Sequence, residues 1–209
     1  MERTTARTWT WIGTLLCGVL LVSFLPSFFR FIEVRPGFRP DDPVLAWISP
    51  VDVAIPLFVV LYSTVVLCLV LLARDRSLLL RGLQAYLILL LLRMVAMTLL
   101  TLEPPMDMIP LRDPITQVFY PDAEPFAKDL FFSGHTATMF LLFLAVPVRR
   151  WRWPLLLATI FVAAAVILQH VHWTIDVLAA PVGAWMAWWA SGYTVRWARS
   201  KVSLGEEGA

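Results

Sequence analysis

The chain has 209 residues, of which 59% are hydrophobic and only 15% are charged, and its net charge is +2 at pH 7. A soluble domain of this length cannot cover so much apolar surface with polar side chains, so the composition excludes an ordinary water-soluble fold. The small net charge gives no case for nucleic-acid binding. We therefore expect a protein embedded in a membrane.

Six apolar stretches follow one another along the chain, each close to the ~20 residues that a helix needs to cross ~30 Å of hydrocarbon. They lie at about residues 9–29, 51–73, 83–102, 130–148, 153–171 and 174–195. The first follows two arginines, as in a signal peptide, but it is long enough to span and no clean cleavage site follows, so we interpret it as a retained helix. The sequence predicts an all-α fold, a six-span transmembrane helical bundle that forms one multi-pass domain over residues 1–209.

The basic residues between these stretches predict the orientation, because cytoplasmic loops are enriched in lysine and arginine. If both termini are cytoplasmic, the inner segments hold eleven of the seventeen basic residues: Arg3, Arg7, Arg74, Arg76, Arg81, Arg149, Arg150, Arg152, Arg196, Arg199 and Lys201. The outer segments hold Arg30, Arg35, Arg39, Arg112 and Lys128. We therefore expect cytoplasmic termini and a plasma (inner) membrane location.

The loops and cysteines add little chemistry of their own. Two proline-rich outer segments, residues 30–50 and 103–129, favour turns or extended backbone on the membrane surface. Cys17 and Cys68 both lie inside apolar stretches, so neither a disulfide nor a thiolate metal site is expected.

Two polar motifs at neighbouring membrane boundaries contain all three histidines of the chain. The first reads Asp-Leu-Phe-Phe-Ser-Gly-His-Thr over residues 129–136, and the second reads His-Val-His-Trp-Thr-Ile-Asp over residues 170–176. The predicted orientation places both at the outer side, at the depth of a lipid headgroup. Phosphoryl transfer needs one imidazole to attack phosphorus and another to protonate the leaving oxygen. We therefore predict that His135 and His172 are catalytic and that the active site faces the extracytoplasmic side.

Other residues of the two motifs fit the same chemistry. Asp176 follows His172 by four residues, so its carboxylate reaches the imidazole from the same helical face or from the first turn of the next helix. Such a carboxylate fixes the histidine tautomer and stabilises its developing positive charge. Ser133, Gly134 and Thr136 lie at a helix start, where hydroxyl and backbone N–H groups favour a bound anion.

These residues carry a family resemblance. Asp-x3-Ser-Gly-His-Thr at residues 129–136 and His-x-Thr-x-Asp-Val at residues 172–177 resemble the two signature motifs of the sphingomyelin synthase family, within the superfamily of type 2 phosphatidic acid phosphatases. Residues 93–105 are similar to that family's helix-to-loop segment, and His170 fits the second motif. The resemblance covers a motif core of about residues 81–189 together with the six-span architecture.

The resemblance implies a membrane phosphotransferase without metal or cofactor. His172 would take the phospho-headgroup from a glycerophospholipid, Asp176 would orient it, and His135 would protonate the diacylglycerol leaving group and later activate the acceptor. In that family the acceptor is ceramide, so the expected partners are a phospholipid donor and a lipid acceptor. A homo-oligomer is left open. The candidates for substrate binding are Asp129, Ser133, Gly134, Thr136, Arg93 and His170.

The sequence also departs from related patterns. It contains no Lys-x6-Arg-Pro, and Val166 stands where ordinary lipid phosphatases carry an arginine that binds phosphate. Trp173 replaces the usual tyrosine, and Glu103 and Lys128 replace smaller or neutral residues. Arg93 lies within the third stretch, where an isolated charge costs several kcal/mol, so a partner or a water-filled cavity is implied. On position alone, the phosphate charge would be met by Arg93, Arg112 or Lys128.

Two other functions stay open at this point. A lipid phosphatase or a phospholipase C-type hydrolase of the same superfamily would use the same phosphohistidine, with water in place of the lipid acceptor. In a different class of protein, His135, His170 and His172 would be ligands of a haem or metal in a membrane electron carrier. The hydroxyls around His135 and the carboxylate near His172 favour phosphoryl chemistry.

Overall fold

The structure, a computed structural model, describes residues 2–113 and 126–206, with side-chain surroundings for residues 8–113 and 126–193. This part of the chain is helical, as the sequence predicted. Its helices are α1 (Glu2–Glu33), α2 (Pro43–Trp47), α3 (Ala54–Ala73), α4 (Arg76–Leu99), α6 (Gly134–Ala145), the 3-10 helix η1 (Arg149–Trp151), α7 (Arg152–Leu168) and α8 (Thr174–Glu206).

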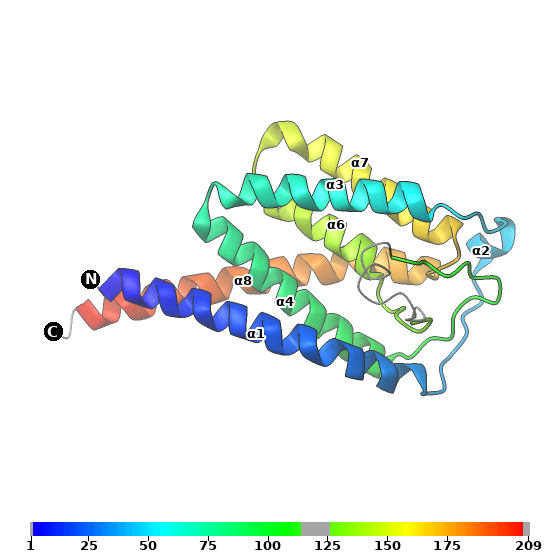
Figure 1. Cartoon of the computed structure of the whole chain (residues 1–209), viewed down its shortest axis with the longest axis horizontal. Helices are drawn as coiled ribbons and strands as arrows, with labels where there is room; N and C mark the ends of the chain where they lie inside the picture. The colour runs from blue at the N-terminus through cyan, green and yellow to red at the C-terminus, as the bar shows by residue number, and fades with distance from the viewer. Residues whose placement is uncertain (1, 114–125, 207–209) are drawn as a thin grey trace.

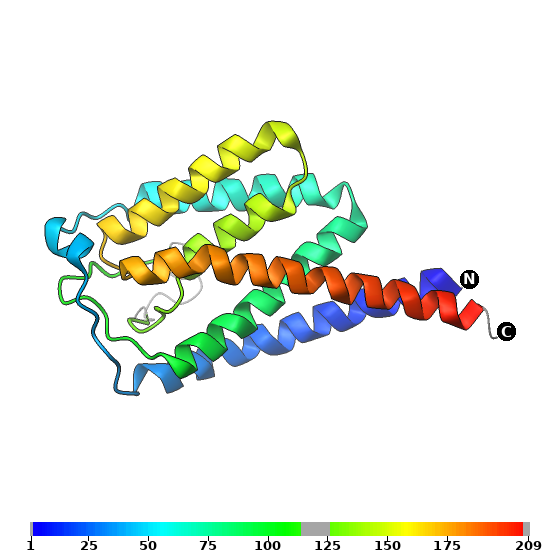
Figure 2. The ribbon, with the colours of Figure 1, turned by 180° about the vertical axis from the view of Figure 1, so that it is seen from behind.

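The long helices form one bundle in which α8 packs against α4 and α6, α7 packs against α3 and α6, and α1 packs against α4. Figures 1 and 2 show α2, the ends of α1 and α4, and the start of α8 at one end of the bundle. The turn between α3 and α4, the start of α1 and the end of α8 lie at the opposite end. The two motifs therefore share one end of the bundle, while its side of the membrane stays a prediction. Five of the basic residues used for that prediction have side chains outside the described part: Arg3, Arg7, Arg196, Arg199 and Lys201.

Within the part of the chain that the structure describes, four helical segments are long and apolar enough to cross a membrane by length and composition: Thr8–Glu33, Ala54–Ala73, Arg76–Leu99 and Arg149–Leu168. They confirm the prediction of a helical membrane protein at this level. The two remaining predicted spans correspond to α6 and α8. Helix α6 has 12 residues, or about 18 Å, which is shorter than the hydrocarbon core, whereas α8 has 33 residues. The number of six spans stays a prediction.

Helix α6 is shorter than the predicted span of residues 130–148 because both of its ends have local stop signals. Ser133 is its N-cap, and the Ser133 hydroxyl accepts from the backbone N–H of Thr136. At the other end the helix stops at Ala145, and Pro147 follows after one extended residue. The residue before a proline is disfavoured in helical backbone, so the helix cannot continue through it.

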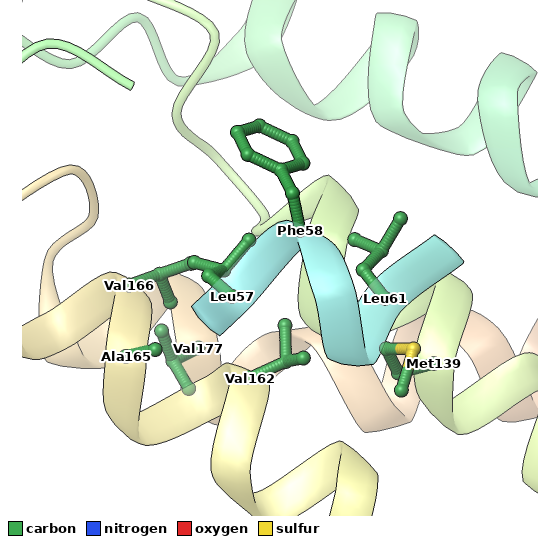
Figure 3. Close-up of a cluster of buried hydrophobic side chains, with 8 residues drawn as sticks. All are labelled: Leu57, Phe58, Leu61, Met139, Val162, Ala165, Val166 and Val177. Atoms are coloured by element: carbon green, nitrogen blue, oxygen red, sulfur yellow. The ribbon is translucent and has the colours of Figure 1, made fainter. Parts of the chain in front are cut away.

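The core next to the end that holds the two motifs joins α3, α6, α7 and α8. Figure 3 shows its eight buried residues: Leu57, Phe58, Leu61, Met139, Val162, Ala165, Val166 and Val177. Val166 is fully buried in this cluster. The position at which ordinary lipid phosphatases carry an arginine is therefore a packing position in this chain, and it faces apolar neighbours.

Small residues on α8 let the neighbouring helices approach closely. Ala180, Ala184 and Ala187 are fully buried in a second cluster with residues of α4 and α6. The ring of Phe132 lies against Gly183 at a distance that leaves no room for a Cβ. The peptide before α6 is thereby held against the first half of α8, which brings the two motifs together.

Candidate active site

His135 and His172 lie side by side at the end of the bundle. His135 is the second residue of α6, and His172 lies in the turn between α7 and α8. Their ring centroids are 6.3 Å apart, and the backbone N–H of Ser133 donates to the carbonyl oxygen of Asp176 at 3.1 Å. This bond ties the start of α6 to the first turn of α8. The two imidazoles are close enough to contact the same phosphate group.

Asp176 lies in the first turn of α8, which begins at Thr174 rather than continuing through His172. One carboxylate oxygen, Oδ2, accepts from the backbone N–H of Trp173 at 3.0 Å and lies 3.5 Å from Nδ1 of His172. This separation is longer than a hydrogen bond, and within the described residues Nδ1 has no other partner. Catalytic hydrogen bonds of ligand-free sites often shorten only when substrate binds.

Arg93 reaches the site from α4 and is 7% exposed. Its Nε donates to the carbonyl oxygen of Phe132 at 2.8 Å, and its Nη2 lies 2.7 Å from Oδ1 of Asp129. The partner that a charge in this span requires is therefore Asp129. Arg93 thus holds the segment that leads into α6 at two points, Asp129 and Phe132.

Gly134 is the residue on which the Arg93 guanidinium packs. A Cβ built at Gly134 would lie 2.5 Å from Nη1 and 2.7 Å from Cζ of Arg93. Because both hydrogen bonds of Arg93 hold its guanidinium in place, the arginine cannot move aside without breaking them.

Gly134→Ala is therefore expected to destabilise the protein by about 1–3 kcal/mol and to reduce turnover at least about tenfold. The thermal midpoint in detergent and the turnover rate check this prediction. Gly82→Ala is the matched control, because the nearest atom to its Cβ would be a leucine methyl group at 3.5 Å. An unchanged Gly134→Ala variant would show that the packing of Arg93 on Gly134 is unimportant.

Ser133 and Thr136 are buried at the N-terminus of α6 and bind each other. The Ser133 hydroxyl donates to Oγ1 of Thr136 at 3.1 Å and accepts from its backbone N–H at 3.4 Å. Both hydroxyls therefore stabilise the helix start. Their contact with substrate stays a prediction.

His170 occupies a special backbone position at the end of α7. Its φ of 56° lies in the left-handed region, and the N–H groups of His170 and Val171 donate to the carbonyl oxygens of Ile167 and Val166. This is the Schellman pattern, in which glycine is the usual residue at the position of His170. Nδ1 of His170 pairs with Oδ1 of Asp107 at 2.8 Å, a bond that lowers the pKa of this carboxyl. The third histidine thus fastens the loop that follows α4, and its predicted contact with substrate stays untested.

A groove of about 500 Å³ runs between α3, α4 and α6. Its polar end contains Tyr62, Arg93, Asp129, Gly134 and His135. From there it continues between apolar side chains, among them Leu69, Leu72, Leu79, Leu83, Leu142 and Ala145. The groove therefore combines a charged end beside His135 with a long apolar wall. His172 is 3% exposed. It lies next to His135 but does not line the groove itself.

Of the three cations considered for phosphate, Arg93 lines the groove. Lys128 is engaged elsewhere, because its Nζ lies 2.8 Å from Oε1 of Glu103 and donates to the carbonyl oxygen of Arg35 at 2.7 Å. Arg112 is exposed on the loop that follows α4. The geometry therefore favours Arg93 as the residue that meets a phosphate charge beside His135.

The ion pair between Lys128 and Glu103 predicts a pH dependence. The hydrogen bond from Lys128 lowers the pKa of Glu103 from its usual 4.5, and the backbone N–H of Gly37 contributes. Because the pKa is lower in the folded state, ionised Glu103 stabilises the protein above about pH 4.5, and this contribution is lost as the pH falls through the folded-state pKa.

The thermal midpoints of wild type and Glu103→Gln are therefore expected to differ at pH 7 and to converge once the pH falls below the folded-state pKa of Glu103. Thermal unfolding in detergent at several pH values measures this convergence. A gap that stays constant across the range would exclude the ion pair as its cause.

The structure adds an aromatic wall that sequence reasoning missed. The hydroxyl of Tyr62 donates to Oδ1 of Asp113 at 2.6 Å, and the ring of Phe58 lies 6.1 Å from the ring of His135. Both aromatic residues belong to α3. Because their neighbours in the sequence are apolar, the sequence indicates only that they belong to a membrane span. The structure shows that Phe58 contacts His135 and that Tyr62 lines the groove beside it.

The three histidines are not arranged as a metal site. Among the side chains described, those of residues 8–113 and 126–193, no group of three or more histidine, cysteine, aspartate or glutamate residues is placed to hold a metal ion. His135 and His172 face each other, whereas His170 pairs with Asp107.

The fold and the site together define a helical membrane protein with a pair of imidazoles, a supporting carboxylate and an ion pair beside an apolar groove. Residues 128–193 match the family model described as PAP2 superfamily C-terminal. The match supports the type 2 phosphatidic acid phosphatase superfamily, and thus a phosphatase-type or phosphotransferase-type lipid enzyme. No curated protein and no solved structure gave a match to the chain.

Proposed function

We propose that the protein transfers a phospho-headgroup from a glycerophospholipid to ceramide or another lipid alcohol through a phosphohistidine, as a sphingomyelin synthase-like enzyme. The observation that carries this proposal is the groove, because a charged end beside His135 continues into an apolar wall. A lipid presents the same sequence of surfaces, with a phosphate at one end and acyl chains behind it.

The chemistry is divided between the two imidazoles. His172 attacks phosphorus with the nitrogen that points away from Asp176, and Asp176 stabilises the charge that develops on the ring. The bond between phosphorus and the diacylglycerol oxygen breaks, and His135 donates a proton to that oxygen. His135 then removes a proton from the acceptor hydroxyl, which attacks the phosphohistidine and releases His172.

Arg93 supports the negative charge on phosphorus. Its guanidinium already holds Asp129 at the groove, so an incoming phosphate meets a cation that is fixed in place by Phe132 and Gly134. A preorganised charge of this kind stabilises the transition state without having to reorganise. The proposal places the site at the extracytoplasmic side of a plasma (inner) membrane.

A hydrolase is the second candidate function, because the match to the PAP2 superfamily supports a phosphatase-type enzyme as well as a transferase. In a hydrolase, water attacks the phosphohistidine in place of a lipid hydroxyl. The two functions share the first half-reaction and differ only in the group that resolves it.

The test is to incubate the purified protein with headgroup-labelled phosphatidylcholine or phosphatidylethanolamine, with and without ceramide or diacylglycerol, and to separate the products by chromatography. Label that moves into an acceptor lipid supports the transferase. Label that appears only in a water-soluble phospho-headgroup supports the hydrolase. A protein that moves no label from either donor would refute both functions for these lipids, and a haem absorption band in the same sample would favour the electron carrier.

A further inference from the structure

The residue before α8 offers no side-chain acceptor for the first N–H groups of the helix. The residue before the helix is Trp173, whose indole carries a donor and no acceptor. Its own Nε1 donates to the carbonyl oxygen of Glu103 at 2.9 Å. The carboxylate of Asp176 reaches back to the N–H of Trp173, as the third residue of a capping box does. The next N–H group, that of Thr174, needs an acceptor from elsewhere in the chain.

Asp42 of the first outer loop supplies that acceptor. Its Oδ2 accepts from the backbone N–H of Thr174 at 2.6 Å, and its Oδ1 accepts from the Thr174 hydroxyl at 3.0 Å. The same Oδ1 accepts from the N–H groups of Val44 and Leu45 at 3.0 and 3.3 Å, at the start of α2. One carboxylate therefore caps two helices that are far apart in the sequence.

Packing holds α2 in the place that this double cap requires. Leu45 is the buried residue of this five-residue helix, and it packs in a cluster with Leu102, Leu130 and Trp173. Burial alone would raise the pKa of Asp42, but the hydrogen bonds from Thr174 and from the start of α2 outweigh it and leave the pKa below its usual 3.8. Asp42 is therefore ionised near neutral pH, in the form that accepts these bonds.

We propose that Asp42 is a positioning residue of the active site, which fixes the start of α8 and thereby holds Asp176 behind His172. Thr174 lies midway between these two residues in the sequence, so a shift of the helix start changes their 3.5 Å separation directly. This inference rests on the proposed function. It makes the first outer loop a part of the site, although none of its residues lines the groove.

The test compares Asp42→Ala, Asp42→Asn and the control Asp41→Ala, which removes a neighbouring exposed carboxylate. Asp42→Ala is expected to lower kcat about 10- to 100-fold with KM nearly unchanged, because a small displacement of a catalytic group costs rate while the groove stays intact. Asp42→Asn keeps one acceptor oxygen and is expected to recover part of the rate. Size-exclusion chromatography checks that each variant is folded.

Hydrogen exchange over residues 170–178 gives a readout that does not need turnover. Asp42→Ala is expected to speed exchange of this segment relative to wild type and Asp41→Ala. Equal kcat in Asp42→Ala and Asp41→Ala would overturn the inference, as would a change confined to KM. If wild type moves no lipid label, the proposed function fails, and the exchange experiment still decides whether Asp42 fixes the start of α8.

Discussion

His172→Ala is expected to reduce headgroup release by at least about 1,000-fold while the protein remains folded, because the variant lacks the imidazole that we propose as the nucleophile. Nδ1 of His172 has no hydrogen-bond partner among the described residues, so its removal breaks no such bond of the native fold. The rate of label transfer measures the loss, and the thermal midpoint shows that folding is retained.

A donor with a nitrophenolate leaving group separates the functions of the two histidines. Nitrophenolate departs without a proton, so His135→Asn is expected to release about one equivalent per enzyme and then stop, because no base activates the acceptor. His172→Ala is expected to release none. A rapid-mixing experiment that follows nitrophenolate absorption distinguishes these outcomes, and a burst from His172→Ala would assign the attack on phosphorus to another group.

The pairing of the two motifs could be predicted because its signals are local. Apolar length predicted the helices, and the positions of His135, His172 and Asp176 at the helix ends predicted that these side chains lie close together, as they do. Their catalytic roles stay a prediction. The predicted bounds of α6 were less accurate, because the cap at Ser133 and the stop before Pro147 depend on a few residues, which a hydropathy window averages out.

The partners of the loop residues were not predictable from the sequence. Asp42 followed by proline is a recognisable helix start, but its bond to Thr174 depends on how two distant segments meet. Lys128 was considered for phosphate on its position alone, and the structure shows it bound to Glu103. For His170, only the structure reveals that a residue other than glycine adopts the left-handed backbone conformation at the end of α7.

Arg93→Met is expected to destabilise the protein by about 2–3 kcal/mol and to reduce transfer by at least about 100-fold. The variant leaves the buried carbonyl of Phe132 without its donor and leaves the carboxylate of Asp129 without its partner. The side chain of Asp129 is 32% exposed, so water offsets part of that cost. The stability and the transfer rate of Arg93→Lys are expected to lie between those of wild type and Arg93→Met, because an ammonium group cannot reproduce both bonds of the planar guanidinium.

The double variant Arg93→Met with Asp129→Asn separates structural pairing from phosphate binding. Removing both charges is expected to restore part of the stability, since no unpaired carboxylate is left at the groove. Transfer is expected to stay low, because the cation that meets the phosphate is still missing. Thermal unfolding and label transfer are measured for wild type, Arg93→Met, Asp129→Asn and the double variant, which completes the double-mutant cycle. Recovery of transfer together with stability would mean that Arg93 acts only by holding Asp129 and the start of α6, and the phosphate charge would then require a different cation.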